Sequence, residues 1–344
     1  MGLKIWLPAI RAKSGADVYV TRLANELSRR GHQPTVEWFP HYYQYAPWLL
    51  RKAAPPTGTQ LVHSNSWYAF AFKRTGIPLV SVVLHCVYRR GFPEWKSASQ
   101  AIFHDHFVGR FERWSFSMSD HVLAISSSTE AEVVADFGVR NISTIPLWVD
   151  TDAFRPTVDA DCTTDEPRTR VLIVGNMGKR KGGDLISRFC EKLGPKFAVT
   201  VIAGLRGVPP QVSAHGAELT IISGLSESDL IKYYQSTDIV ASLSRHEGFG
   251  YTALEAMSCG KPVVSFDVSG LRDVVANGVC GFLVPKEDIT SMAETCRNLS
   301  LDPMLRQRLG QNGRAIAQTA FGADTAVDAH LRLYNRLVES SIQK

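Results

Sequence analysis

Two glutamates separated by seven residues, Glu247 and Glu255, form the most distinctive chemical pattern in the sequence. Between them lie Gly248, Phe249 and Gly250, and a glycine-bearing loop of this kind exposes backbone N–H groups. A helix that begins just after such a loop adds partial positive charge. The segment therefore predicts a binding site for an anion such as a diphosphate.

The two carboxylates suit the groups on either side of that anion. A carboxylate that does not contact phosphate can accept hydrogen bonds from sugar hydroxyls. A nucleotide sugar carries hydroxyls on both sides of its diphosphate, on the transferred sugar and on the ribose. Glu247 and Glu255 therefore favour a nucleotide-sugar site, whereas the alternative interpretation is a surface loop and a helix with an incidental acid.

The elements around the loop are those that an anion site needs. A buried strand is expected to end at Leu243, and a helix is expected to begin at Tyr251 or Thr252. Gly260, just before Pro262, is a typical helix end. The loop then joins the carboxyl end of a strand to the N-terminus of a helix.

The rest of the chain alternates strand and helix patterns, which predicts an α/β fold with parallel sheets wrapped by helices. The strands are expected at residues 3–8, 35–39, 60–63, 78–84, 121–125, 143–146, 170–175, 198–203, 219–223, 239–243, 262–266 and 281–284. The polar segment 156–167 predicts a linker between two lobes, 1–160 and 165–321, with a C-terminal helix over 322–344 that packs back on the first lobe. Ligands of such folds bind at the carboxyl ends of the strands, here facing a central cleft.

The distribution of charge and the cysteines indicate which partners and which cellular compartment to expect. Residues 1–150 hold 16 Lys and Arg against 11 Asp and Glu, while residues 151–344 hold 22 of each, so the net charge of +5 lies in the first half. This favours an anionic partner or membrane surface for that half, with a solvated face as the alternative. Six scattered cysteines, and the lack of a signal peptide or a bilayer-spanning segment, predict a cytoplasmic protein with free thiols. No nucleic-acid partner is expected.

The spacing of Glu247 and Glu255 in this setting resembles the signature of retaining glycosyltransferase family 4. Five other segments share the resemblance: residues 23–32, 145–156, 174–182, 267–273 and 278–284. The family has the GT-B fold, which consists of two Rossmann-like lobes with parallel sheets facing a central cleft. The resemblance thus implies an acceptor-binding first lobe and a second lobe that binds the nucleotide sugar.

The resemblance also implies roles for residues of the second lobe. Glu255 would bind the ribose hydroxyls, and Glu247 would contact hydroxyls of the donor sugar. Backbone groups of residues 248–250 would line that sugar, with Tyr251 and Thr252 at the helix start beside it. Lys181 would neutralise the diphosphate.

In the first lobe, Gly15 would let the loop backbone approach the phosphates, and His85 matches a family histidine near the sugar and the leaving group. The alternative for His85 is a histidine satisfied within the core. The sequence departs from the family at Asn176, where an arginine is usual. Lys179 or Arg180 would then have to supply the second cation of the phosphate clamp.

The predicted chemistry needs no metal and no cofactor besides the donor substrate. Lys181 and the helix start near Thr252 would stabilise negative charge on the departing phosphate. No carboxylate nucleophile is evident, so front-side attack with retention of configuration is expected. Two Asp-x-Asp pairs, at 150–152 and 159–161, are interpreted as lobe-closing and linker residues rather than metal ligands.

Residues 38–48 carry six aromatics, and Arg51, Lys52, Arg89, Arg90, Phe92 and Trp95 add cations and rings in the same lobe. These side chains suit a glycan or lipid-linked acceptor, with peripheral contact to the inner face of a membrane, whereas the alternative is core packing.

The class of reaction leaves alternatives open. A nucleotide-sugar epimerase or phosphorylase of the same fold, a dinucleotide dehydrogenase and a non-catalytic nucleotide-sugar-binding protein are the competing interpretations. The donor is expected to be a UDP-hexose on family frequency, with a GDP-sugar as the alternative.

Overall fold

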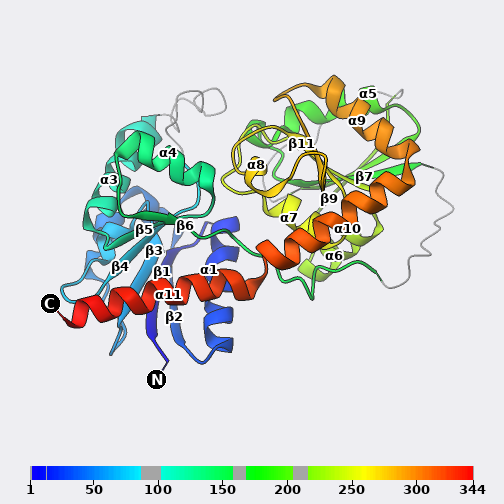
Figure 1. The fold of residues 1–344 in the computed structure, drawn as a ribbon. Coiled ribbons are helices and arrows are strands. Elements are labelled where there is room, and N and C mark those ends of the chain that lie inside the picture. Colours follow the sequence, from blue (N-terminus) through cyan, green and yellow to red (C-terminus); the bar gives the residue numbers. More distant parts are fainter. Residues whose placement is uncertain (1, 13, 87–101, 158–167, 204–215, 344) are drawn as a thin grey trace. The chain divides into compact units, whose positions relative to one another are not determined.

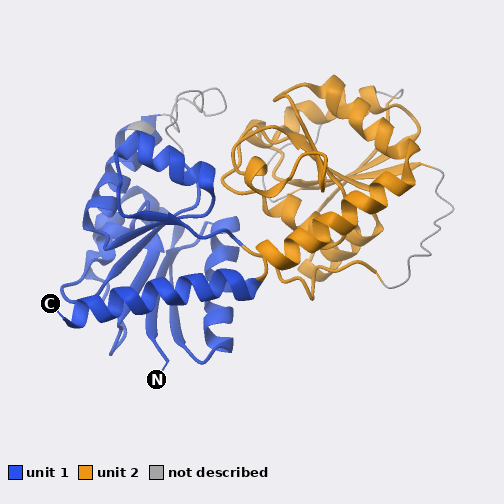
Figure 2. Ribbon diagram, in the orientation of Figure 1, with its two compact units in different colours: residues 1–147, 323–344 blue, residues 148–322 orange. Residues whose placement is uncertain are grey.

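The computed structural model describes residues 2–12, 14–86, 102–157, 168–203 and 216–343. The chain forms two compact units, which consist of residues 1–147 with 323–344 (unit 1) and residues 148–322 (unit 2) (Figure 2). Each unit contains one parallel six-stranded sheet (Figure 1). The predicted α/β class with parallel sheets is therefore confirmed. Most of the predicted linker lies outside the described residues.

The sheet of unit 1 has the strand order β2-β1-β3-β4-β5-β6. Its strands are β1 (Lys4–Ile10), β2 (Gln33–Phe39), β3 (Leu61–Asn65), β4 (Leu79–Val83), β5 (His121–Ala124) and β6 (Ile142–Thr144). The order reverses between β1 and β3, and such a reversal opens a crevice at the carboxyl ends of the strands.

Helices cover both faces of this sheet. Helix α1 (Gly15–Arg29) and the C-terminal helix α11 (Ala323–Ile342) pack on the face that carries His63. The other face carries Val62 and packs against η2 (Pro47–Lys52), η3 (Ala69–Phe72), α3 (Gly109–Met118) and α4 (Ser127–Phe137). A π turn over His104–Val108 leads directly into α3.

Helix α11 is fixed to unit 1 by a buried chain of hydrogen bonds. Tyr334 donates to His63 Nδ1 (2.8 Å), and the Tyr19 hydroxyl lies 3.1 Å from His63 Nε2 and 3.2 Å from His330 Nε2. His330 Nδ1 lies 2.8 Å from the Ala326 carbonyl and therefore donates to it. Every ring nitrogen is satisfied when both imidazoles are neutral.

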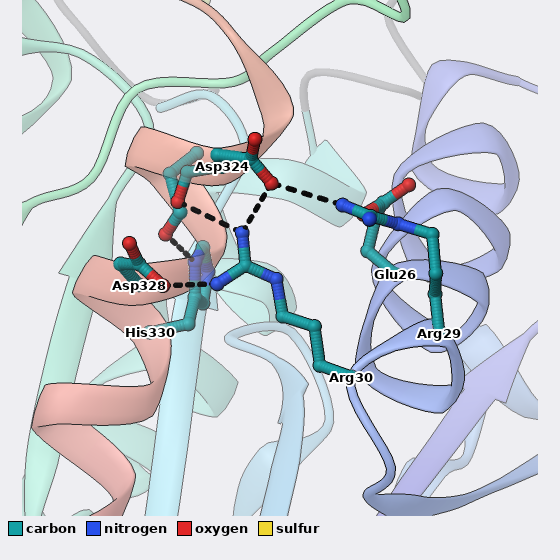
Figure 3. Close-up of polar contacts among 7 residues, drawn as sticks. Glu26, Arg29, Arg30, Asp324, Asp328 and His330 are labelled. Carbon is teal, nitrogen blue, oxygen red and sulfur yellow. Dashed lines mark hydrogen bonds and ion pairs between the residues drawn. The ribbon is translucent and has the colours of Figure 1, made fainter.

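An exposed group of ion pairs lies at the start of α11 (Figure 3). Arg29 and Arg30 contact Asp324 at 2.9 and 2.7 Å, and Arg30 also contacts Asp328. Exposed pairs of this kind contribute little to stability, so the docking of α11 depends mainly on its buried side chains, which include Val327 and Leu333 as well as His330 and Tyr334.

The sheet of unit 2 has the strand order β12-β11-β10-β7-β8-β9. Its strands are β7 (Thr169–Gly175), β8 (Phe197–Ala203), β9 (Glu218–Ser223), β10 (Ile239–Ser242), β11 (Val263–Phe266) and β12 (Gly281–Val284). Counted from β7, this is the order of dinucleotide-binding folds. Its reversal lies between β7 and β10, so the loops after these two strands border the expected binding crevice.

The helices of unit 2 are α5 (Ile186–Leu193), α6 (Glu227–Ser236), α7 (Tyr251–Ser258), α8 (Leu271–Val274), α9 (Ile289–Leu301) and α10 (Pro303–Ala320). Helix α5 packs on α9, and α7 packs on α10. Helix α5 begins directly after a 3-10 turn over Gly183–Leu185. Within the described residues, no helix is long and apolar enough to cross a membrane.

Candidate active site

Two loops meet at the strand-order reversal of unit 2. One follows β7 and the other follows β10, and Gly182 lies where they touch. Gly182 has a φ of 74°, and a Cβ there would lie 2.2 Å from the Leu243 carbonyl oxygen. Only glycine therefore allows the two loops to approach this closely.

Lys181 and Glu247 form an ion pair across the two loops. The Lys181 Nζ contacts Glu247 Oε1, and Arg180 Nη1 lies 3.8 Å from Glu247 Oε2. Burial alone raises the pKa of Glu247, but Lys181, Arg180 and a hydrogen bond from Ser244 outweigh it and lower that pKa to about 2. Glu247 is therefore a carboxylate, and thus an acceptor only, at neutral pH.

Arg180 is held in place from the neighbouring loop. Its Nη1 donates to the His246 carbonyl at 2.9 Å, and its own carbonyl accepts from the Arg245 N–H at 2.9 Å. Asn176, in contrast, is exposed directly after β7. Of the basic residues proposed to replace the missing family arginine, Arg180 is the one whose side chain reaches Glu247.

Arg245 is a buried cation that the sequence did not single out. It donates to both oxygens of Asp184, at 2.6 and 2.8 Å, and it also contacts Glu287 and the Lys179 carbonyl. Glu287 has a φ of 67°, an uncommon conformation for a residue other than glycine. Arg245 thereby ties together three segments around the crevice.

Glu255 lies on α7 and is buried. Its Oε2 accepts a hydrogen bond of 3.0 Å from the Tyr234 hydroxyl of α6. Along the chain, Glu247 precedes the first turn of α7 and Glu255 follows it. Tyr234 is a partner that sequence reasoning missed, because no local pattern links it to Glu255.

Helix α7 begins at Tyr251, within the range that the sequence predicts. Gly250 precedes it with a φ of 110°, and a Cβ at Gly270 would lie 2.5 Å from the Glu247 carbonyl oxygen. The N–H groups of Ala253 and Leu254 donate to the Gly250 carbonyl at 3.0 and 3.1 Å, and the partial positive charge of this helix start, which includes Thr252, favours an anion.

Phe249 is buried, and its ring contacts those of Tyr251 and Phe321 at 6.1 and 5.7 Å between centroids. Its side chain thus anchors the loop in the core. Only its backbone, like that of Gly248, is available to a ligand.

Gly15 and His85 belong to unit 1. Gly15 is the first residue of α1, capped by Ser14, rather than a loop residue. His85 follows β4, half-buried, with its ring 5.8 Å from that of Trp67. A small pocket of about 10 Å³ lies at the carboxyl edge of this sheet, and it is lined by residues such as Ala16, Asn65 and Leu84.

Asp150 of the first Asp-x-Asp pair has a structural role. Its Oδ1 accepts hydrogen bonds from the backbone N–H groups of Asp152 and Ala153, both at 3.0 Å. In the described part of the chain, no three His, Cys, Asp or Glu side chains are grouped as metal ligands. The second pair, at 159–161, lies outside the described residues.

Comparison with known proteins identifies the class. A profile of the glycosyl transferases group 1 matches residues 155–316, and a profile of glycosyltransferase family 4 matches residues 34–153. The D-inositol 3-phosphate glycosyltransferase of Xylanimonas cellulosilytica is 31% identical over 239 residues, which span 63% of this chain and 57% of that relative.

Solved structures show the same architecture. The sucrose-phosphate synthase of Thermosynechococcus elongatus superposes with a TM-score of 0.83 at 20% identity, covering 98% of this chain and 100% of that one. Anabaena HepE in complex with UDP-glucose gives 0.72 at 18% identity, covering 99% and 100%. The two sheets thus define the GT-B fold. The chain belongs to glycosyltransferase family 4.

Proposed function

We propose that this glycosyltransferase moves a hexose-type sugar, with retention of configuration, from a nucleoside-diphosphate sugar to a glycan or lipid-linked acceptor. The observation that supports it most directly is the Lys181–Glu247 ion pair at the crevice between β7 and β10. A donor diphosphate on the α7 amides would meet Lys181 and Arg180. The sugar and the ribose would then meet the Glu247 and Glu255 carboxylates.

Each of these groups has a distinct part in the proposed reaction. Breaking the bond between the anomeric carbon and the diphosphate places negative charge on the leaving oxygen. Lys181, Arg180 and the amides near Thr252 stabilise that charge without a metal. The leaving phosphate accepts the proton of the acceptor hydroxyl on the same face. The roles of Gly15 and His85 near the phosphates and the sugar remain predictions from the family resemblance.

The donor nucleotide is proposed to be UDP. Support comes from family frequency and from the UDP-glucose bound to the structurally similar HepE. Two classes of acceptor are considered. The relatives named for D-inositol 3-phosphate indicate a phosphorylated polyol as one candidate, but the first of them is matched over only 57% of its length. The aromatics of unit 1 favour a glycan or lipid-linked acceptor, reached from the cytoplasmic side.

A donor screen and a release assay test the proposal. A thermal-shift panel of UDP- and GDP-sugars should show stabilisation by one nucleotide class, because a ligand that binds only the folded chain raises its Tm. Free nucleoside diphosphate should then form only when an acceptor is added. An epimerase would change the sugar without releasing nucleotide, and a binding protein would do neither, so either result would overturn the proposal.

A further inference from the structure

Six large apolar side chains of unit 1 are exposed in two short segments of the chain. They lie on two segments, residues 45–49 and 102–114, with exposed fractions between 38% (Trp114) and 58% (Ile102). We call them the aromatic surface: Tyr45, Trp48, Leu49, Ile102, Phe107 and Trp114. Soluble proteins rarely leave so many large apolar groups together in water without a partner.

Ring contacts make this surface continuous. Phe103 lies 5.1 Å from Tyr45 and 5.9 Å from Phe107, measured between centroids. Phe111, which is buried, lies within 6.0 to 6.4 Å of Trp48, Trp114 and Phe107. The two segments, far apart in the sequence, are therefore joined into one patch by these ring contacts.

The exposed members are held outward by buried neighbours. In η2, Pro47 and Leu50 are buried while Trp48 and Leu49, between them, face solvent. On α3, Phe111 is buried and Trp114, three residues later, is exposed. The buried neighbours thus fix the backbone so that these side chains point toward solvent.

The charges beside the aromatic surface are positive and unpaired. Arg51, Lys52 and Arg110 are exposed, and within the described residues none of them forms an ion pair. Arg51 also lies 5.5 Å from the centroid of the Phe70 ring. The two segments contain two acids, Asp105 and Glu112, and Glu112 is fully buried.

We propose that the aromatic surface docks unit 1 on an anionic lipid bilayer. Trp and Tyr side chains prefer the membrane–water interface, and flanking cations bind anionic headgroups. A second copy of the chain is a poorer occupant, since a two-fold interface through this patch would bring the same cations together. Docking on a bilayer would bring unit 1 to the proposed lipid-linked acceptor. It does not depend on the proposed donor site.

The test uses the full chain and vesicles of defined composition. We expect co-sedimentation with phosphatidylcholine vesicles that contain about 30% phosphatidylglycerol, and much weaker binding to phosphatidylcholine alone. The double variant Trp48→Ser, Leu49→Ser should weaken this binding at least about tenfold. Its matched control is Leu301→Ser with Met304→Ser, which removes two apolar side chains of unit 2 that are 83% and 82% exposed and should leave binding unchanged.

The cations are tested separately. A triple change of Arg51, Lys52 and Arg110 to glutamine should remove the preference for anionic vesicles, and so should high salt. UDP-sugar binding by the same variants, followed by thermal shift, should be unaffected, so failure of the docking is distinguishable from failure of the donor site. No binding by the full chain, equal binding to both vesicle types, or a Trp48-dependent dimer by light scattering would each overturn the docking.

Discussion

Lys181 Nζ and Glu247 Oε1 form an ion pair in unit 2, and the two side chains are 20% and 10% exposed. The pair joins the loop after β7 to the loop after β10, the two strands at which the strand order reverses. A diphosphate that enters this site would compete with Glu247 for the lysine and release the carboxylate toward the sugar hydroxyls. In the proposed reaction, the donor would therefore have to open this ion pair before the sugar is transferred.

Replacing Lys181 with alanine should lower kcat/KM for sugar transfer roughly 100-fold or more, because one preorganised charge on the leaving group is lost. Steady-state nucleotide release measures the effect. Lys196→Ala is the control. It removes an exposed lysine just before β8, at the amino end of that strand, and should keep near-normal turnover. Near-normal turnover of Lys181→Ala would show that the diphosphate lies elsewhere.

Glu247→Gln should change the pH dependence of stability. The folded-state pKa of Glu247 is about 2, below the unfolded value of 4.5, so its ionised form stabilises the fold above pH 4.5. That contribution, on the order of 3 kcal/mol, is lost as pH falls from 4.5 toward 2. Urea unfolding of both chains should therefore give a difference that is largest at neutral pH and shrinks below pH 4.5. A pH-independent difference would contradict the assignment.

Arg245→Lys should weaken donor binding although Arg245 lies behind the Lys181–Glu247 pair. Lysine cannot make the two parallel bonds to Asp184, so the loops that carry Lys181 and Glu247 lose their common support. Arg245 is 7% exposed but its partners Asp184 and Glu287 are 42% and 47% exposed, so we expect a cost above the roughly 1 kcal/mol of an exposed pair and below the roughly 3–5 kcal/mol of a fully buried one. Arg272→Lys is the control, because its pair with Asp267 is exposed and contributes at most about 1 kcal/mol. Equal effects of the two changes on unfolding and on the KM for donor would count against the positioning role.

The loop between β10 and α7 could be predicted as a strand-to-helix connection because its signals are local. Glycines, a helix start at Tyr251 and flanking acids lie within a few residues of one another, and the alternation of strands and helices defines parallel sheets. The same locality explains what was missed. Arg245 stands beside Glu247 in the sequence, but arginine is usually exposed, so its burial against Asp184 depends on the tertiary fold.

The individual hydrogen bonds that hold α11 on unit 1, in contrast, could not be predicted from the sequence. His63 and Tyr334 are 271 positions apart, and neither belongs to a pattern that marks a site. The aromatic residues near position 45 divide between two roles that sequence alone cannot separate. Trp48 is exposed, whereas Phe39 packs against the core. Which role applies depends on the elements that happen to cover each ring.

Acid should loosen unit 1 through His330 and His63. Burial lowers the pKa of both, that of His330 to about 4, so the unfolded chain takes up more protons between about pH 6.5 and 4. Stability conferred by the neutral imidazoles is therefore complete above pH 6.5 and falls with pH below it, by up to about 3 kcal/mol for His330 alone. His330→Gln should be less stable at pH 7.5, because it loses packing, but should show a flatter fall in urea midpoint between pH 6.5 and 4.5. His41→Gln, an exposed histidine of the same unit, should follow the wild-type curve. If His330→Gln also follows that curve, the buried hydrogen-bond chain is not the acid-sensitive element.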